Sequence, residues 1–222
     1  MADEVPSMRD MVRGLPVFPA ELPEFDVRSA PGDPVTLFLA WFAEAVRDKI
    51  LGPQAMTLST ADSAGRVASR VLLCRDVDER GRWYFESNAA SGKGRDLAAN
   101  PRAAASFYWP QQGRQVRLTG EAASAGRAAS AEDFLAKPPA ARAAGLVGHQ
   151  SEPLAGLADL GEALRRAQAE VAANPDLVDP DSTFYALTAD TVEFWQGDPR
   201  RQHRRLQYQR TADAWTSRLL WP

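Results

Sequence analysis

The chain has 222 residues, of which 45% are hydrophobic and 25% charged, and its formal net charge is -3. This balance is typical of a globular protein that can build a hydrophobic core without disulfides. The negative charge argues against a general nucleic-acid binder. Cys74 is the only cysteine, so no internal disulfide can form. One cysteine and two histidines in the whole sequence also do not make a zinc-ligand set.

The amino terminus carries acidic residues and lacks the apolar core of a secretory signal, and no run approaches 18 apolar residues. We therefore expect a cytoplasmic protein without a membrane span. Residues 1–32 are rich in proline and show no sustained period, which predicts an N-terminal arm that is partly extended or disordered. Residues 33–222 are expected to form a single domain.

The first predicted helix begins after Asp33, a good N-cap residue, and Pro34 suits its first position. Apolar residues then recur at steps of three and four along the chain. They predict one apolar face, made of Phe38, Trp41, Phe42, Ala45, Val46 and Ile50.

From residue 54 to residue 122, short alternating segments separated by turn residues predict an antiparallel, meander-like sheet. The strands are expected at 55–60, 66–78, 83–88, 104–109 and 114–122. A short helix capped by Ser91 is expected to interrupt them at 93–100. Closure into a barrel is the most economical arrangement of such strands.

The carboxyl-terminal half returns from helix to strand. Ser130 and Asp133 resemble a capping box that opens a short helix ending before Pro138, and the composition of 157–173 predicts a second helix. Residues 174–182 are expected to form a loop, followed by a strand at 184–197 and a terminal hairpin. These elements predict one α+β domain, with an antiparallel barrel and flanking helices.

Basic residues at the ends of the predicted strands are the strongest sign of a binding site. The sequence contains no phosphate-binding P-loop, dinucleotide fingerprint or hydrolase nucleophile motif. Guanidinium and ammonium groups gathered in a domain of negative net charge favour a site for phosphate or carboxylate. The candidates are Arg70, Arg75, Lys93, Arg114, Arg201 and Arg205.

Seven segments occur in an order and spacing that resembles one known family. They are RVLLCR (70–75), SNAASGKG (87–94), NPRAAASFYW (100–109), GRQVRLTGEA (113–122), HQSEPL (149–154), EFWQGDPRRQHRRLQYQR (193–210) and the terminal WTSRLLWP. Together, over about 34–222, they resemble the pyridoxamine 5'-phosphate oxidase family. The resemblance implies an FMN-binding split β-barrel that works as a homodimer, with FMN sites at the subunit interface.

The resemblance also implies the cofactor contacts. Arg70 and Lys93 match positions that hold the FMN phosphate, with Ser87 on the same strand end, and the backbone of Val71, Leu72 and Leu73 would pass along the flavin. The other matched flavin contacts are Gln115, Gln150, Ser151, Trp195 and Arg205. Gly92 stands where the family usually has an arginine.

The substrate half of the pattern departs from the vitamin-B6 enzymes. Arg201 and His203 match the family's substrate-contacting arginine and histidine, and in a strand they would share one face with Arg205. Four further positions hold the substrate phosphate in those enzymes, and here they are Arg75, Asp133, Lys137 and Ala141. Because Asp133 and Ala141 cannot replace the usual phosphate ligands, the sequence resembles the phenazine-biosynthesis flavin oxidases in this region.

The sequence therefore predicts an FMN-dependent oxidase with O2 as acceptor and a small, carboxylate-bearing substrate of the phenazine-precursor kind. Arg201 and His203 are its predicted catalytic residues, and no metal is expected. Pyridoxine/pyridoxamine 5'-phosphate oxidase activity is the close alternative. A non-catalytic flavin- or heme-binding module, and a nucleic-acid contact through RRQHRR (200–205), are alternatives from other classes.

Overall fold

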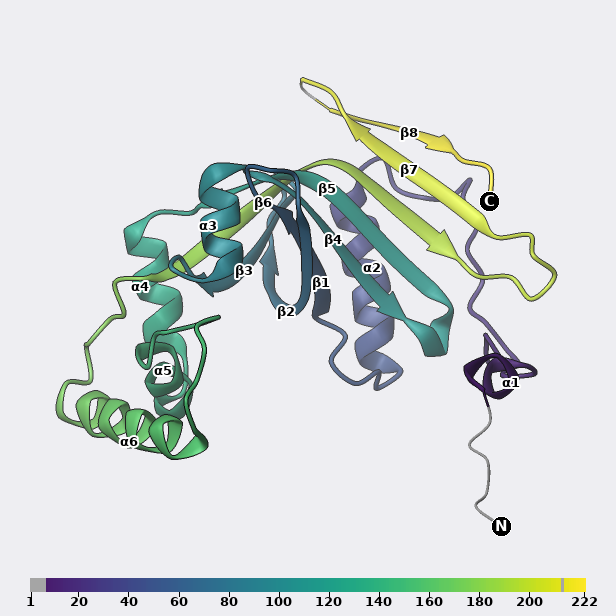
Figure 1. Ribbon diagram of the computed structural model, residues 1–222. Helices are drawn as coiled ribbons and strands as arrows, with labels where there is room; N and C mark the ends of the chain where they lie inside the picture. Colours follow the sequence, from purple (N-terminus) through teal and green to yellow (C-terminus); the bar gives the residue numbers. More distant parts are fainter. Residues whose placement is uncertain (1–6, 213) are drawn as a thin grey trace, which may run out of the picture.

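The protein is described by a computed structural model, which covers residues 7–212 and 214–222 (Figure 1). The helices are α1 (Met8–Val12), α2 (Pro34–Arg47), α3 (Gly92–Ala99), α4 (Arg127–Ala136), α5 (Pro139–Leu146) and α6 (Leu157–Ala173). The strands are β1 (Ala55–Ala61), β2 (Val67–Val77), β3 (Arg82–Asn88), β4 (Arg102–Trp109), β5 (Arg114–Ser124), β6 (Ser182–Gln196), β7 (Arg204–Arg210) and β8 (Trp215–Leu219).

Six antiparallel strands close into a barrel. The hydrogen-bonded order runs β3, β2, β1, β4, β5, β6, and β6 pairs again with β3 to complete the ring. The sheet is not a simple meander, because β4 pairs with β1 rather than with β3. Strand β6 continues past its pairing with β3, and its last part pairs with β7, which in turn pairs with β8. The predicted α+β barrel is confirmed, with a hairpin extending from one wall (Figure 1).

Helix α2 fills one end of the barrel core. The Asp33 carboxylate accepts the backbone N–H of Thr36 at 2.9 Å, which confirms the predicted N-cap. Phe38 and Trp41 are buried against aromatic rings of the barrel, including Phe107 and Phe194. The predicted apolar face was wrong at Val46, which is exposed.

The helical lobe between β5 and β6 differs from the prediction in two places. Helix α4 begins after Gly126, so Ser130 lies inside it and does not cap it. Instead, the Ser130 hydroxyl donates to the Gly126 carbonyl and accepts the backbone N–H of Phe184, which fastens α4 to β6. Helix α5 was not predicted, and it packs with α6 around a small separate core.

The N-terminal arm contacts the body through residues from Phe18 to Pro31, and the part of the prediction that concerns residues 1–6 falls outside the described residues. Phe25 is buried against Trp41, with ring centroids 4.9 Å apart. Phe18 packs over Gly197, where an added Cβ would lie only 2.6 Å from its ring, and Leu22 packs over Gly113 in the same way, at 2.9 Å. The arm is therefore held to the body by its aromatic residues.

A buried carboxylate joins the barrel to the terminal hairpin. Glu193 on β6 accepts hydrogen bonds from Arg117 on β5 at 2.6 Å and from Arg205 on β7 at 2.8 Å. Burial raises the pKa of Glu193, but the bonds from the two arginines outweigh burial and hold it below its usual value. The ionised carboxylate thus stabilises the three-strand junction.

We predict that Glu193→Gln lowers the free energy of unfolding by about 1–3 kcal/mol at pH 7, because a neutral amide cannot replace two charge-assisted bonds. A carboxyl group whose pKa is lowered by folding stabilises the folded state at any pH above its unfolded-state pKa of about 4.3. This contribution is lost as the pH falls through the folded-state pKa. Urea unfolding at fixed protein concentration should show the difference from wild type shrinking below about pH 4. A difference that does not change with pH would contradict this account.

Candidate functional site

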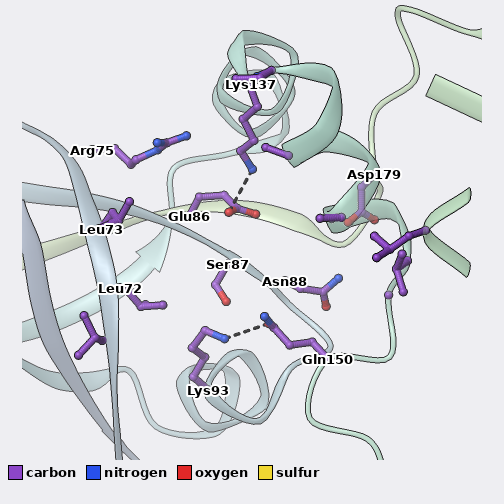
Figure 2. A pocket seen from close by; sticks show the side chains of 18 of the residues that line it. Leu72, Leu73, Arg75, Glu86, Ser87, Asn88, Lys93, Lys137, Gln150 and Asp179 are labelled. Atoms are coloured by element: carbon purple, nitrogen blue, oxygen red, sulfur yellow. Dashed lines mark hydrogen bonds and ion pairs between the residues drawn. The ribbon is translucent and has the colours of Figure 1, made fainter. Parts of the chain in front are cut away.

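A cavity of about 750 Å3 lies between β2, β3, α3 and the helical lobe (Figure 2). Its lining includes most of the residues that the sequence singled out for the cofactor phosphate, the flavin edge and the substrate. They are Val71, Leu72, Leu73, Arg75, Ser87, Lys93, Lys137, Ala141 and Gln150. Segments that are far apart in the chain are thereby brought to one place.

Lys93 dominates one end of this cavity. The hydroxyl of Ser91 caps α3, which begins at Gly92, and so fixes the backbone that carries Lys93. The Lys93 ammonium donates to Ser91 Oγ at 3.2 Å and to Gln150 Oε1 at 2.9 Å. Burial lowers the pKa of Lys93, and the positive charge of Arg70 lowers it further. An anion placed here would relieve both effects.

Two further features suit this end to a phosphate group. The Ser87 hydroxyl is buried in the cavity and has no hydrogen-bond partner in the described part of the chain. Arg70 donates to Thr60 Oγ1 at 2.8 Å and to the Leu58 carbonyl, so a second cation is fixed beside Lys93. A buried unpaired hydroxyl beside two cations fits a ligand with several acceptor oxygens.

The loop that carries Gln150 has an unusual backbone. His149 and Ser151 both have positive φ values, of 56° and 76°, and so occupy the left-handed region without being glycine. Ser151 lies close to the start of α3, because a Cβ added at Gly92 would be 3.8 Å from its hydroxyl. Strain of this kind concentrates at binding sites.

Four charged side chains form a chain of ion pairs at the opposite end of the cavity. Asp133 lies 3.5 Å from Arg75 and 3.6 Å from Lys137, and Lys137 lies 3.0 Å from Glu86. Arg75 and Lys137 thus both have carboxylate partners within the chain, and their predicted contact with the substrate stays a prediction. Glu86 was missed because an acidic residue in an alternating strand is typical of a solvent-facing position.

A second cluster of predicted site residues lies elsewhere. Trp195, Arg201 and His203 line another cavity, of about 530 Å3, together with Phe18 of the arm. Gln115 and Arg205 are the direct neighbours of Trp195 on β5 and β7. His203 Nδ1 accepts the backbone N–H of Asp198 at 3.0 Å, so the neutral imidazole carries its proton on Nε2 and can donate it to a ligand.

Arg201 and His203 lie in the loop before β7, so the strand face that they would share with Arg205 if they lay in a strand does not form. Strand β7 begins at Arg204, and Arg201 ends a turn in which its N–H bonds to the Asp198 carbonyl. Arg201 has a positive φ of 66°. The turn, rather than strand alternation, brings both side chains to the Trp195 cavity.

Most of the basic segment 200–205 is already engaged. Arg200 pairs with Asp198, Arg204 donates to the Phe25 carbonyl, and Arg205 donates to Glu193. Binding of nucleic acid through this segment needs a continuous row of available cations. Because three of the four arginines in this segment already have partners within the chain, the segment does not offer such a row.

The two clusters stand at opposite ends of one strand. Ser87 pairs with Thr183 near the start of β6, and Trp195 lies twelve residues further along that strand. At about 3.3 Å per residue the separation is roughly 40 Å, which no single small ligand can span. Figure 1 shows β6 running from the α4 side to the loop before β7. Within one copy of the chain, the two groups of predicted site residues are therefore far apart.

Other kinds of site find little support. Within residues 7–212 and 214–222, no group of three or more histidine, cysteine or acidic side chains is placed to hold a metal ion. None of the helices in that part of the chain is both long and apolar enough to cross a membrane.

Comparison with known proteins places both regions in one family. Residues 42–196 match the family model described as pyridoxamine 5'-phosphate oxidase, and residues 183–222 match its C-terminal dimerisation region. Pyridoxine/pyridoxamine 5'-phosphate oxidase from Ectopseudomonas mendocina (strain ymp) is 40% identical over 87% of this chain and 90% of its own length. The protein of that name from Burkholderia ambifaria is 41% identical over 91% of this chain and 94% of its own length.

A solved structure resembles the fold closely. It is PhzG from Burkholderia lata 383, crystallised with tetrahydrophenazine-1-carboxylic acid, with a TM-score of 0.81 and 30% identity over 90% of this chain and 99% of that one. The family match, the relatives and the barrel agree with the fold and the oxidoreductase class that the sequence predicted. The chain belongs to the pyridoxamine 5'-phosphate oxidase family of FMN-dependent oxidoreductases.

Proposed function

We propose that the protein is a homodimeric, FMN-dependent oxidase of a small, carboxylate-bearing heteroaromatic substrate. The observation that carries the proposal is the division of the site into two halves, each unable to enclose a cofactor and a substrate alone. A dimer formed through the matched C-terminal region would bring the Lys93 cavity of one copy to the Trp195 cluster of the other.

The chain's own residues would take distinct roles in this site. Lys93, Arg70 and Ser87 would hold the FMN phosphate, and the exposed edge of β2 at Val71–Leu73 would lie along the flavin. Gln150 and Ser151 would contact FMN from the strained loop. Gln115, Trp195 and Arg205 would come from the second copy.

Bound FMN would supply the redox chemistry, in which a hydride passes from substrate to flavin and O2 then takes two electrons and two protons to leave as H2O2. Arg201 and His203 would orient the substrate. Arg201 has no ion pair within the described residues, so its guanidinium can grip a planar carboxylate with two parallel bonds. The neutral His203 would donate from Nε2 to a substrate oxygen or nitrogen.

A second candidate is pyridoxine/pyridoxamine 5'-phosphate oxidase, the name of the relatives that are about 40% identical. The ligand named with PhzG favours the carboxylate substrate instead. So does the ion pairing of Arg75 and Lys137, because neither cation is free to receive a phosphate dianion.

We predict that Lys93→Ala weakens FMN binding roughly thirtyfold, about 2 kcal/mol, because a charge-assisted bond to the phosphate is lost. Fluorescence titration of the apoprotein with FMN measures the change. Lys49→Ala, which removes an exposed lysine at the end of α2, is the matched control and should bind FMN normally. Unchanged affinity in Lys93→Ala would remove this residue from the site.

We also predict oxygen uptake with a reduced heteroaromatic carboxylic acid, at a kcat/KM on the order of a hundredfold above that for pyridoxine 5'-phosphate. The measurement is oxygen consumption by the FMN-loaded protein with both phosphorylated vitamers and a panel of such acids. Highest turnover with a phosphorylated vitamer would favour the second candidate. Full FMN loading without oxygen uptake would favour a non-catalytic module.

A further inference from the structure

An alternating series of charges, which we call the charge chain, stands at the end of the cavity that faces α4: Arg75, Asp133, Lys137 and Glu86. Arg75, Lys137 and Glu86 line the cavity, and Asp133 pairs with the two cations beside it. Each neighbour in the series is of opposite sign, and the four formal charges sum to zero. Figure 2 shows Lys137 reaching down from α4 to Glu86 on β3, with Arg75 beside them. The members come from three different elements, so folding itself assembles the charge chain.

The charge chain is fixed before any ligand arrives. The Lys137 side chain is only 9% exposed, and its ammonium lies 5.1 Å from the centre of the Phe134 ring. Glu86 is held from its other side, because the Ser182 hydroxyl donates to Glu86 Oε1 at 3.0 Å. An incoming anion would have to break a partly buried ion pair to reach Lys137, and that costs more than breaking an exposed one.

A third carboxyl group adds to the negative side of this end. Asp179 is buried, lines the same cavity and lies near Glu86. Burial raises its pKa, and the charges of Asp181 and Glu86 act in the same direction. The wall around Lys137 is thus neutral or slightly negative.

The Lys93 end has the opposite character. The partners of the Lys93 ammonium are uncharged, since they are the Ser91 hydroxyl and the Gln150 amide oxygen, and Arg70 adds a second positive charge. The cavity is therefore polarised along its length. A dianion is stabilised at the Lys93 end and finds no net positive charge at the other end, where carboxylates offset both cations.

We propose that Glu86 and Asp133 are specificity-determining residues that exclude a phosphate from the Lys137 end of the cavity. They select a substrate that presents an uncharged edge with N–H or O–H donors to this wall. The proposal rests on the proposed function, in which FMN occupies the Lys93 end. The substrate carboxylate then points away from the charge chain, toward Arg201 of the other copy.

The test compares wild type with Glu86→Gln and Asp133→Asn, each of which keeps the side-chain shape and removes one negative charge. Glu132→Gln is the matched control, because it removes an exposed charge from the same helix, next to Asp133. The FMN-loaded proteins are titrated without oxygen, following flavin absorbance. The probes are pyridoxine 5'-phosphate and pyridoxine, which differ only in the phosphate.

We expect Glu86→Gln and Asp133→Asn each to bind pyridoxine 5'-phosphate on the order of tenfold more tightly than wild type, since one repulsive charge is gone. Affinity for pyridoxine and for FMN should stay within about twofold in both variants, and Glu132→Gln should match wild type throughout. Because the two variants lie on different elements, misfolding of one leaves the other as a test.

The proposal is overturned if both variants keep wild-type affinity for pyridoxine 5'-phosphate while holding FMN normally. It is also overturned if wild type prefers the phosphorylated compound as strongly as the variants do. Failure of the proposed function has a different signature, because wild type would then not bind FMN. Calorimetric titration of the FMN-free proteins with the same two probes would still measure the effect of the charge chain.

Discussion

The length of strand β6 is the constraint on which the site depends. This one strand of 15 residues pairs with β3 and the barrel along its first part and with β7 along its last part. The same backbone that closes the barrel therefore carries Trp195 far from the cavity that contains Lys93. Rigid strands cannot fold back to join the two, so the proposed site needs a second chain, and residues 183–222 match a model of a dimerisation region.

The distribution of charge divides the site by function. Cations with uncharged partners gather near Lys93, while the cations near Glu86 are matched one to one with carboxylates. The buried Glu193 uses the same chemistry for a structural purpose, holding Arg205 in place beside Trp195. Whether an arginine or lysine can bind an anion therefore depends on whether a carboxylate of the chain already pairs with it.

Sequence patterns predicted the elements whose signals are local. The Asp33 and Ser91 caps could be predicted because the residue that precedes the helical pattern itself supplies the side-chain oxygen that accepts a backbone N–H of the helix. Helix α4 was misplaced because its true cap, Gly126, has no side chain, while Ser130 imitates a cap from inside the helix. Helix α5 could have been found from Pro139 at its first turn and the alanines that follow.

The site itself was only partly predictable. Resemblance found Arg70, Ser87, Lys93 and Gln150. The structure brings the last three to one end of a cavity and places Arg70 near Lys93. Glu86 escaped notice because its partners lie on α4 and β6, and no local pattern reports such long-range pairing. The turn at Arg201 was likewise not predicted, since a non-glycine residue with positive φ has no sequence signature.

Complementation between two inactive variants tests the shared site most directly. Lys93→Ala damages one half of the site and Arg201→Ala the other, so each variant alone is expected to lose substrate turnover at limiting FMN. If the halves come from different chains, random mixed dimers contain one intact site, and co-expression should restore about a quarter of the wild-type activity. No recovery in isolated mixed dimers would mean that each site is built within a single chain, which contradicts this account.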